Sequence, residues 1–532
     1  MKVTATRLSY AATGYFSKLV NDYLQQDANL QSFYQHTPGW QGIEAAIAAR
    51  KASTTNRTVL VQALKEQYAN LPASDAVNNA IHQLSLPNTF TIKTAHQPAI
   101  FTGTLYFIYK ILHAIKLAAA AKEKWHEYNF VPVYYMGSED ADLDELGNIY
   151  MSGDTLQWDT KQTGAVGRMN TKGLEKIIHR IDGELSVQPY GKELVQLLKD
   201  CYLQSTTVQE ATLKLLHHLF QQYGLVVLIP DNALLKSIAR SIFEDELFNN
   251  RSASIVEKTI EQLAVHYKAQ AQPRAINLFY LKDAIRNRIE KAGDDFVVVD
   301  TDIRFTATAL KTELEQHPER FSPNVILRGL FQEMILPNIV FIGGGGELAY
   351  WLEFKDLFAY YKVPFPVLLL RNSFLIIEKK WTEKIAKLHL TDEQVFLSAP
   401  QLLTNMVKEN SNGKLSLESE LNQAAAFYNQ LLQKAVAVDA TLQKHVAALA
   451  AKATKPLQQL QQKLLRSEKR KYDNEQRQLE LVKNTLFPKN SLQERVDNFM
   501  PFYAKHGHAF ITMLYDFSLT TEQEFVVIKE EA

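Results

Sequence analysis

Cysteine is nearly absent from this sequence, which has one among 532 residues. A single thiol cannot form an intrachain disulfide or supply a zinc site, and it suits a reducing compartment. Cys201 lies in an amphipathic pattern at residues 197–203, so we expect a packed or half-exposed helix residue, with a catalytic thiol as the alternative. The 14 histidines show no HExxH or other paired metal spacing, and the GxSxG elbow of serine hydrolases is missing. The sequence therefore predicts no metal site built from histidine or cysteine side chains and no prosthetic group.

Net charge is absent too. Lys plus Arg and Asp plus Glu both number 58, so the chain lacks the long-range field that draws a protein to nucleic acid or anionic lipid. No apolar run approaches the roughly 18 residues that a membrane span needs. The first residues, 1–5, lack the apolar core of a signal peptide. We therefore expect a cytoplasmic protein that binds neither nucleic acid nor membranes.

Short apolar runs bounded by turn residues recur through the middle of the chain, as is typical of buried parallel strands. These runs cover residues 90–94, 130–136, 225–229, 296–299, 338–342 and 365–370. Helical patterns lie between several of them, notably at residues 105–121, 208–223 and 347–361. Alternation of strand and helix predicts βαβ units and a parallel sheet. We expect an α/β protein with a Rossmann-like core over residues 1–375, whose first part, residues 1–85, is helical.

Residues 415–486 have almost no strand signal and keep apolar residues at near-heptad spacing, which predicts a coiled-coil seam. The seam residues are Leu442, Val446, Leu449, Ala453, Leu460 and Leu464. We expect a helical coiled-coil domain at residues 376–490, and a C-terminal segment, residues 491–532, that packs back on the core. An apolar seam of this length also predicts self-association as a homodimer.

The sequence leaves the shape of the coiled coil open. Residues 438–440 could be the turn of a helical hairpin with Asp439 as the N-cap. Alternatively, Pro456 could mark a kink or the start of a second helix.

In an open α/β sheet, ligands bind outside the carboxyl ends of the strands. His96 and Gln97 follow the first predicted strand and precede a turn into a helix. Backbone N–H groups in that turn would form an anion site, and Lys110 would be within reach of it. The turn residues are Thr102, Gly103 and Thr104. The alternative is that Gly103 only turns the chain and Lys110 lies on the surface.

Five carboxylates follow the strand at residues 130–136, and they are Glu139, Asp140, Asp142, Asp144 and Glu145. They repel one another unless Mg²⁺, a substrate amine or basic side chains neutralise them. We expect Glu139 and Asp140 to point inward because they are nearest to the strand end. The alternative is that only one or two point inward and the others cap the next helix.

Four consecutive glycines follow the strand at residues 338–342, and they are Gly343, Gly344, Gly345 and Gly346. Glycine lets the backbone approach a phosphate or carboxylate closely, although the run matches neither a Walker A motif nor GxGxxG. Glu347 opens the next helix. Arg371 follows the last strand and could form a bidentate pair with a carboxylate or phosphate. The alternative is that Arg371 forms an ion pair with Glu347 or Glu139. Together these strand ends predict a binding site.

The chain also resembles the BshC family, the cysteine ligases assigned to bacillithiol biosynthesis, in ordered segments over nearly its whole length. These segments are residues 94–98 (TAHQP), 101–110 (FTGTLYFIYK), 132–142 (PVYYMGSEDAD), 277–280 (NLFY), 322–328 (SPNVILR), 336–351 (LPNIVFIGGGGELAYW), 371–373 (RNS), 487–488 (FP) and 492–495 (LQER). The resemblance implies a Rossmann-type core related to class I aminoacyl-tRNA synthetases. It also implies inserted connecting segments and a coiled coil that supports dimerisation.

The resemblance further implies that L-cysteine and glucosaminyl malate are the substrates and that a carboxylate is activated, with ATP or ADP and Mg²⁺ as the expected co-substrates. Whether ATP is the energy source, and whether AMP or ADP forms, stays open. Glu139 and Asp140 would bind an amine or Mg²⁺, while Lys110, Arg328 and Arg371 would neutralise developing charge. Other expected binding residues in the resembling segments are Tyr106, Asp142, Asn324, Tyr350 and Ser373.

The sequence departs from the family at three places. The family usually reads Gly-Gln-Gln at residues 95–97, Glu-Asp-His-Asp at 139–142 and Gly-Pro-Gly-Glu at 344–347. We hypothesise that His96 occupies space vacated at Ala141. Two alternative functions remain: an acyl-activating or nucleotidyl-transferring enzyme for another amino acid or sugar amine, and a non-catalytic nucleotide-binding scaffold.

Overall fold

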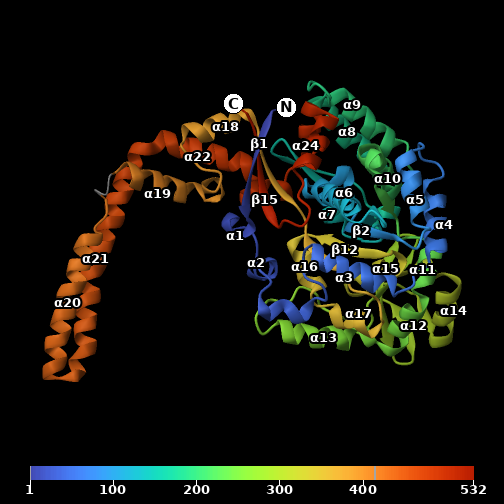
Figure 1. The fold of residues 1–532 in the computed structure, drawn as a ribbon, viewed down its shortest axis with the longest axis horizontal. Helices are drawn as coiled ribbons and strands as arrows, with labels where there is room; N and C mark the ends of the chain where they lie inside the picture. Colours follow the sequence, from blue (N-terminus) through green and yellow to red (C-terminus); the bar gives the residue numbers. More distant parts are fainter. Residues whose placement is uncertain (1, 412–414, 532) are drawn as a thin grey trace. The chain divides into compact units, whose positions relative to one another are not determined.

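A computed structural model describes residues 2–411 and 415–531 (Figure 1). The chain divides into two compact units. The first contains Ala5–Leu375 and Leu492–Ile528, and the second contains Ile376–Ser491 with short terminal pieces. Within the described residues, we find no helix that combines the length and apolarity needed to cross a lipid bilayer.

The centre of the first unit is a five-stranded parallel sheet of order β13-β12-β2-β3-β6. Its strands are β2 (Thr89–His96), β3 (Asn129–Met136), β6 (Val226–Leu228), β12 (Asn338–Gly343) and β13 (Val367–Leu370). These match five of the six predicted runs, so the parallel sheet is confirmed. After β2, the chain adds β3 and then β6 on one side of that strand. Later in the sequence it adds β12 and then β13 on the other side. Adjacent β2 and β12 therefore form the topological switch point, where such sheets bind ligands.

Helices cover this sheet. The apolar core on the sheet includes residues of α3 (Trp40–Lys51) and α6 (Tyr106–Lys124), together with Phe90, Ile92 and Ile342 from the strands. Burial of such side chains supplies most of the free energy that holds helix to sheet. The other helices in the first half of this unit are α1 (Tyr10–Thr13), α2 (Lys18–Leu24), α4 (Arg57–Tyr68), α5 (Asp75–Gln83), α7 (Leu143–Leu146), α8 (Leu174–Leu185), α9 (Gly191–Leu198), α10 (Val208–Phe220) and α11 (Ala233–Ile238).

The helices that follow are α12 (Arg240–Asn249), α13 (Arg251–Leu263), α14 (Ala307–Gln316), α15 (Val325–Ile335), α16 (Gly345–Trp351), α17 (Lys355–Tyr360), α23 (Met500–His506) and α24 (His508–Phe517). The predicted helix at residues 347–361 is thus two short helices. Cys201 is buried in a π-helical turn, Lys199–Leu203, and burial raises the pKa of its thiol to about 12. It is therefore a packed thiol rather than a thiolate nucleophile.

The predicted parallel strand at residues 296–299 is wrong. This segment is β9 (Asp295–Val298), which pairs antiparallel with β8 (Ile285–Ala292) and β10 (Arg304–Thr306). The same sheet continues to β7 (Leu278–Lys282) and β11 (Phe321–Pro323). β9 buries only alternate residues, Phe296 and Val298, as expected for an antiparallel strand with one covered face. Two antiparallel segments, β4 (Asn148–Met151) and β5 (Asp154–Gln157), form a separate hairpin, and β1 (Val3–Ser9), β15 (Glu524–Glu530) and β14 (Ser373–Ile377) form a third sheet.

The second unit is helical, and Figure 1 shows its two long helices, α20 (Glu418–Val438) and α21 (Gln443–Lys469), side by side. Asp439 caps the turn between them by accepting a 2.8 Å hydrogen bond from the Thr441 N–H. Pro456 lies inside α21. The hairpin turn at Asp439 is therefore correct, and Pro456 starts no new helix. The remaining helices are α18 (Lys379–Lys387), α19 (Ala399–Asn410) and α22 (Asp473–Leu486).

The predicted seam is only partly covered within one chain. Val446 is buried, whereas Leu442, Leu449 and Leu460 are 38 to 46% exposed. The homodimer stays a prediction.

Candidate functional site

A cavity of about 760 Å³ opens at the carboxyl edge of the parallel sheet. The structure brings many of the predicted site residues to its wall. They are His96, Gln97, Tyr106, Asp140, Asp142, Asn324, Arg328, Gly344, Gly345, Gly346, Glu347, Tyr350 and Arg371. The predicted residues Lys110, Thr102, Gly103, Glu139, Gly343 and Ser373 are not part of that wall. The glycine run after β12 thus faces the cavity, and the turn after β2 does not.

The turn after β2 uses its own N–H groups. The Thr102 and Gly103 N–H groups donate to the carbonyls of Ala99 and Ile100, and the Leu105 N–H donates to Asp497 at 2.8 Å. The backbone has positive φ at residues 101, 102 and 103. Asn498 holds this conformation by donating to the Phe101 and Gly103 carbonyls at 2.9 and 2.5 Å. The geometry therefore favours the alternative in which Gly103 turns the chain, rather than an anion site.

Glu139 is paired inside the protein. Its carboxylate accepts a 2.5 Å hydrogen bond from Lys236 of α11 and a 3.1 Å bond from Ser322. Both Lys236 and Glu139 are buried. Its charge is therefore already neutralised, and it does not face the cavity as an amine or Mg²⁺ ligand.

Asp140 reaches the cavity but is saturated by two guanidinium groups. Arg328 of α15 pairs with both of its oxygens, one at 2.7 Å, and Arg286 of β8 lies 3.2 Å away. Burial alone would raise the pKa of Asp140, but the two arginines lower it below its ordinary value. Two guanidinium groups therefore face one carboxylate at this point of the wall, and they have more N–H donors than Asp140 can accept. The wall as a whole is balanced, because Asp142, Glu145 and Glu347 also line it, together with Arg371 and Arg495. Among the residues described, no group of three or more His, Cys, Asp or Glu side chains could hold a metal ion.

Arg286 was missed in the sequence. It comes from the antiparallel sheet, 146 positions after Asp140 (286 − 140), and its guanidinium stacks 4.0 Å from the centre of the Phe279 ring. A stacked guanidinium is held in place while its remaining N–H groups stay available. The sequence has two arginines in this strand, Arg286 and Arg288. Only the fold shows that Arg286 is the one that reaches the cavity. Gln332 and Arg495 also line the cavity and were missed.

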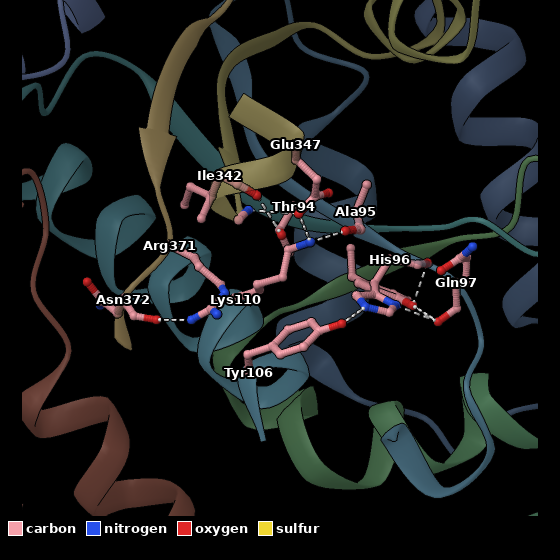
Figure 2. A network of polar contacts seen from close by, with 12 residues as sticks. Thr94, Ala95, His96, Gln97, Tyr106, Lys110, Ile342, Glu347, Arg371 and Asn372 are labelled. Atoms are coloured by element: carbon pink, nitrogen blue, oxygen red, sulfur yellow. Dashed lines mark hydrogen bonds and ion pairs between the residues drawn. The ribbon is translucent and has the colours of Figure 1, made fainter. Parts of the chain in front are cut away.

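Lys110 is a buried link between two strand ends, as Figure 2 shows. Its ammonium donates to the Ala95 carbonyl at 2.5 Å and to Glu347 at 2.6 Å. Glu347 in turn accepts the Gly344 N–H at 2.7 Å. Burial lowers the pKa of Lys110, and Glu347 partly opposes that change. Lys110 therefore fixes the glycine turn against β2 rather than reaching into the cavity.

Arg371 forms its ion pair with a residue that the sequence did not suggest. Its partner is the fully buried Glu494 at 2.7 Å, so the predicted alternatives, Glu347 and Glu139, are wrong. Arg371 also donates to Ser373 at 3.0 Å and lies 4.8 Å from the centre of the Tyr106 ring. These contacts anchor the C-terminal segment to the sheet edge and leave one side of the guanidinium on the cavity wall.

His96 is a neutral imidazole with a defined tautomer. Burial lowers its pKa to about 4, with a further contribution from Lys110. Its Nδ1 lies 3.1 Å from the Gln97 carbonyl, which can only accept, so Nδ1 carries the proton. Nε2 therefore accepts the Tyr106 hydroxyl at 2.9 Å (Figure 2). Ala141 is exposed and off the cavity wall, so the hypothesis that His96 fills its space gains no support.

Two predicted polar residues on the wall are partly engaged elsewhere. Asn324 caps α15 by accepting the Ile326 N–H at 2.9 Å, and it donates to Asn277 at 2.8 Å. Gln97 donates to Asp142 at 3.4 Å. Asn324 therefore shapes the wall mainly by fixing the start of α15.

Comparison with known proteins gives a consistent match over both units. Residues 1–372 match the family model described as the bacillithiol biosynthesis BshC N-terminal Rossmann-like domain. Residues 374–530 match the BshC C-terminal coiled-coil domain. A protein of Cytophaga hutchinsonii is 40% identical over 488 residues, which is 92% of each chain. One of Flavobacterium johnsoniae is 38% identical over 98% of this chain and 99% of its own. Both carry the name "Putative cysteine ligase BshC".

Proposed function

The chain belongs to the bacillithiol biosynthesis BshC family, and from this premise we propose that it is a ligase that joins L-cysteine to glucosaminyl malate. The bond formed is an amide between the cysteine carboxyl carbon and the glucosamine nitrogen. Such a bond does not form spontaneously from a free carboxylate, so the carboxylate must first be activated. We propose activation by ATP, as an acyl-adenylate or an acyl-phosphate.

The observation that carries this proposal is the surplus of guanidinium groups over carboxylates at Asp140. Arg286 and Arg328 together neutralise Asp140 and retain N–H donors beyond those that it accepts. Cysteine brings one carboxylate to the cavity, and glucosaminyl malate brings two. Bidentate guanidinium–carboxylate pairs combine charge with a fixed geometry. The cavity therefore fits small substrates that carry carboxylates.

The chain's own residues can support the two chemical steps. In the first, a cysteine carboxylate oxygen attacks a phosphorus atom of ATP and displaces pyrophosphate or ADP. In the second, the amine lone pair attacks the acyl carbon, AMP (from an acyl-adenylate) or inorganic phosphate (from an acyl-phosphate) leaves with the bonding electrons, and the nitrogen loses a proton. Arg328 and Arg371 on the wall would stabilise negative charge on the acyl and phosphate oxygens. Mg²⁺ would enter with the nucleotide phosphates, because nucleotide sites commonly hold it through few protein ligands.

The direct test is a ligation assay with the purified chain, cysteine, glucosaminyl malate and ATP, with product and nucleotides measured by mass spectrometry. We expect bacillithiol to form only when ATP is present. Arg286→Met should lower kcat/KM at least about tenfold, because a desolvated charge-assisted contact is lost. Arg288→Met is the matched control on the same strand, since Arg288 pairs with Glu290 away from the cavity. A chain that makes no product and consumes no ATP would refute the proposal.

The same assay separates the alternatives. Product formed with other amino acids or sugar amines, but not with cysteine and glucosaminyl malate, would indicate a related acyl-activating enzyme. Binding of ATP without binding of glucosaminyl malate would indicate a nucleotide-binding scaffold.

A further inference from the structure

Lys93 is an ionisable residue in the middle of the central strand of the sheet. Its side chain is fully buried beside the stacked Phe341 and Trp351 rings, whose centres lie 5.4 and 5.1 Å from Nζ. A buried ammonium is costly unless its hydrogens all find acceptors. Lys93 donates to Glu333 at 2.8 Å and to the side-chain oxygen of Gln332 at 2.5 Å. Both partners lie on α15 and are adjacent in sequence.

Glu333 is fixed independently of Lys93. It accepts from Arg50 at 2.7 Å and from Asn338 at 2.8 Å, and all of these side chains are buried. The ammonium is therefore held in place by a rigid network rather than by Gln332. Burial lowers the pKa of Lys93 to about 8, with Glu333 acting in the opposite direction, so the charged form predominates at neutral pH.

Gln332 is the one member of this network that reaches the cavity wall. It is 4% exposed. An ammonium can only donate, so Lys93 must face the amide oxygen of Gln332 and not its nitrogen. The amide NH₂ is thereby turned away from Lys93. In the parts of the chain that the structure describes, that nitrogen has no hydrogen-bond partner.

Gln332 also shares a helix face with the arginine that holds Asp140. Val325, Arg328 and Gln332 all line the cavity and are spaced three and four residues apart on α15, so they form one stripe. A neutral NH₂ donor in a defined orientation thus stands one turn along from a guanidinium.

We propose that Gln332 is a specificity-determining residue that donates a hydrogen bond to an oxygen of the carboxylate-bearing substrate held by Arg328, and that Lys93 is the positioning residue that fixes its orientation. This inference rests on the proposed ligase function. It assigns Lys93 a role that the strand's own packing does not need, because an apolar residue would fill that position without a charge.

The test is a double-mutant cycle on the full chain, with KM for cysteine and for glucosaminyl malate measured separately from kcat, and Kd measured by calorimetry. Gln332→Met removes the donor and should raise one of the two KM values three- to tenfold, because a typical neutral hydrogen bond has that effect. Gln332→Glu keeps a partner for Lys93 but faces the substrate with a negative charge, and should raise the same KM at least tenfold. In both variants kcat should change less than KM.

Lys93→Met should raise the same KM, because the amide of Gln332 is then free to rotate. Adding Gln332→Met to Lys93→Met should not raise that KM further, because the Gln332 amide is already misoriented in Lys93→Met. Thr91→Val is the matched control. Thr91 is a buried residue on the same face of β2 that donates to Asn338 at 3.2 Å and does not contact Gln332. It should lower stability and leave both KM values within about twofold.

Unchanged KM and Kd values in Gln332→Met would overturn the proposal, as would fully additive effects of the two substitutions. If Lys93→Met fails to fold, the two Gln332 variants still decide the donor role. A wild-type chain without ligase activity refutes the proposed function separately. In that case a Kd for either substrate that depends on Gln332 supports the donor role, and a wild-type chain that binds neither substrate overturns both.

Discussion

Two glycine-containing turns lead from adjacent strands of the parallel sheet into helices, and they do opposite things. The turn after β2 has positive φ at three successive residues. Its N–H groups donate to carbonyls within the protein, and its carbonyls accept from Asn498. The turn after β12 has no residue with positive φ, and Gly344, Gly345 and Gly346 line the cavity. The first is a structural turn, and the second is part of the candidate site.

This contrast shows what decides the role of a glycine turn. Glycine supplies either an unusual backbone conformation or room for a neighbour. At Gly103 a Cβ would meet the Ala99 Cβ at 2.9 Å, whereas at Gly346 it would meet no protein atom within 4 Å. The backbone conformation and the space around the Cα thus separate two motifs that look alike in sequence.

The largest expected effect comes from breaking the link between the two strand ends. Lys110→Met removes the ammonium that holds Ala95 and Glu347 and leaves the Glu347 carboxylate without its cation. We expect a loss of about 2–3 kcal/mol in the free energy of unfolding, below the range for fully buried pairs because Glu347 is partly exposed. Urea denaturation measures it. Lys116→Met, on the same helix and stacked on Tyr515, should cost clearly less, and equal losses would contradict the link.

A pH titration examines the group at the end of β2. Because the pKa of His96 falls to about 4 in the folded chain, the unfolded chain binds more protons between about pH 6.5 and 4. Stability should therefore decrease by about 2–3 kcal/mol as the pH falls through that range, and His96 should contribute no pH dependence above it. The measurement is the difference between wild type and His96→Gln, which cannot titrate. Parallel stability curves for the two proteins would show that His96 titrates normally.

Gly103→Ala tests the structural turn. Alanine there requires a φ of +62° and a close contact with Ala99, which together should cost about 1–3 kcal/mol of folding free energy. Substrate KM should stay within about twofold, because the turn is off the cavity wall. A raised KM at unchanged stability would restore the prediction of an anion site at Thr102 and Gly103.

Gly346→Ala is the counterpart in the other turn and should have the smallest effect on stability, within about 1 kcal/mol of wild type. The added methyl group meets open space on the cavity wall, so we expect KM to rise about threefold or more through crowding of the substrate. Steady-state kinetics and thermal unfolding of the same preparation measure both. If this substitution lowers stability and leaves KM unchanged, the two turns do not differ in the way described.

Much of the fold could be predicted because buried parallel strands are continuous apolar runs. Residues 130–136 and 338–342 have no periodic polar face to confuse the pattern. The strand at residues 295–298 is short and buries alternate residues, so its pairing direction depended on hairpins that the pattern did not reveal. Lys93 carries a signal of its own in the sequence, because a lysine inside a buried strand requires acceptors from another element.

The charge state of the site could not be predicted, because the partners are far apart in sequence. Glu139 meets Lys236 after 97 residues, Asp140 meets Arg328 after 188, and Arg371 meets Glu494 after 123. The sequence suggested an acidic loop that would bind an amine or Mg²⁺. The fold neutralises both leading carboxylates and leaves arginine N–H groups on the wall, which changes the kind of ligand that the wall favours.

Calorimetric binding of glucosaminyl malate to wild type, Arg286→Met and Asp140→Asn tests this account most directly. If Arg286 and Arg328 bind the substrate carboxylates, Arg286→Met should weaken binding at least about tenfold. Asp140→Asn should bind no more weakly than wild type. The opposite result, with Asp140→Asn much weaker and Arg286→Met unchanged, would show that Asp140 holds the substrate amine and would contradict carboxylate binding by the two arginines at Asp140.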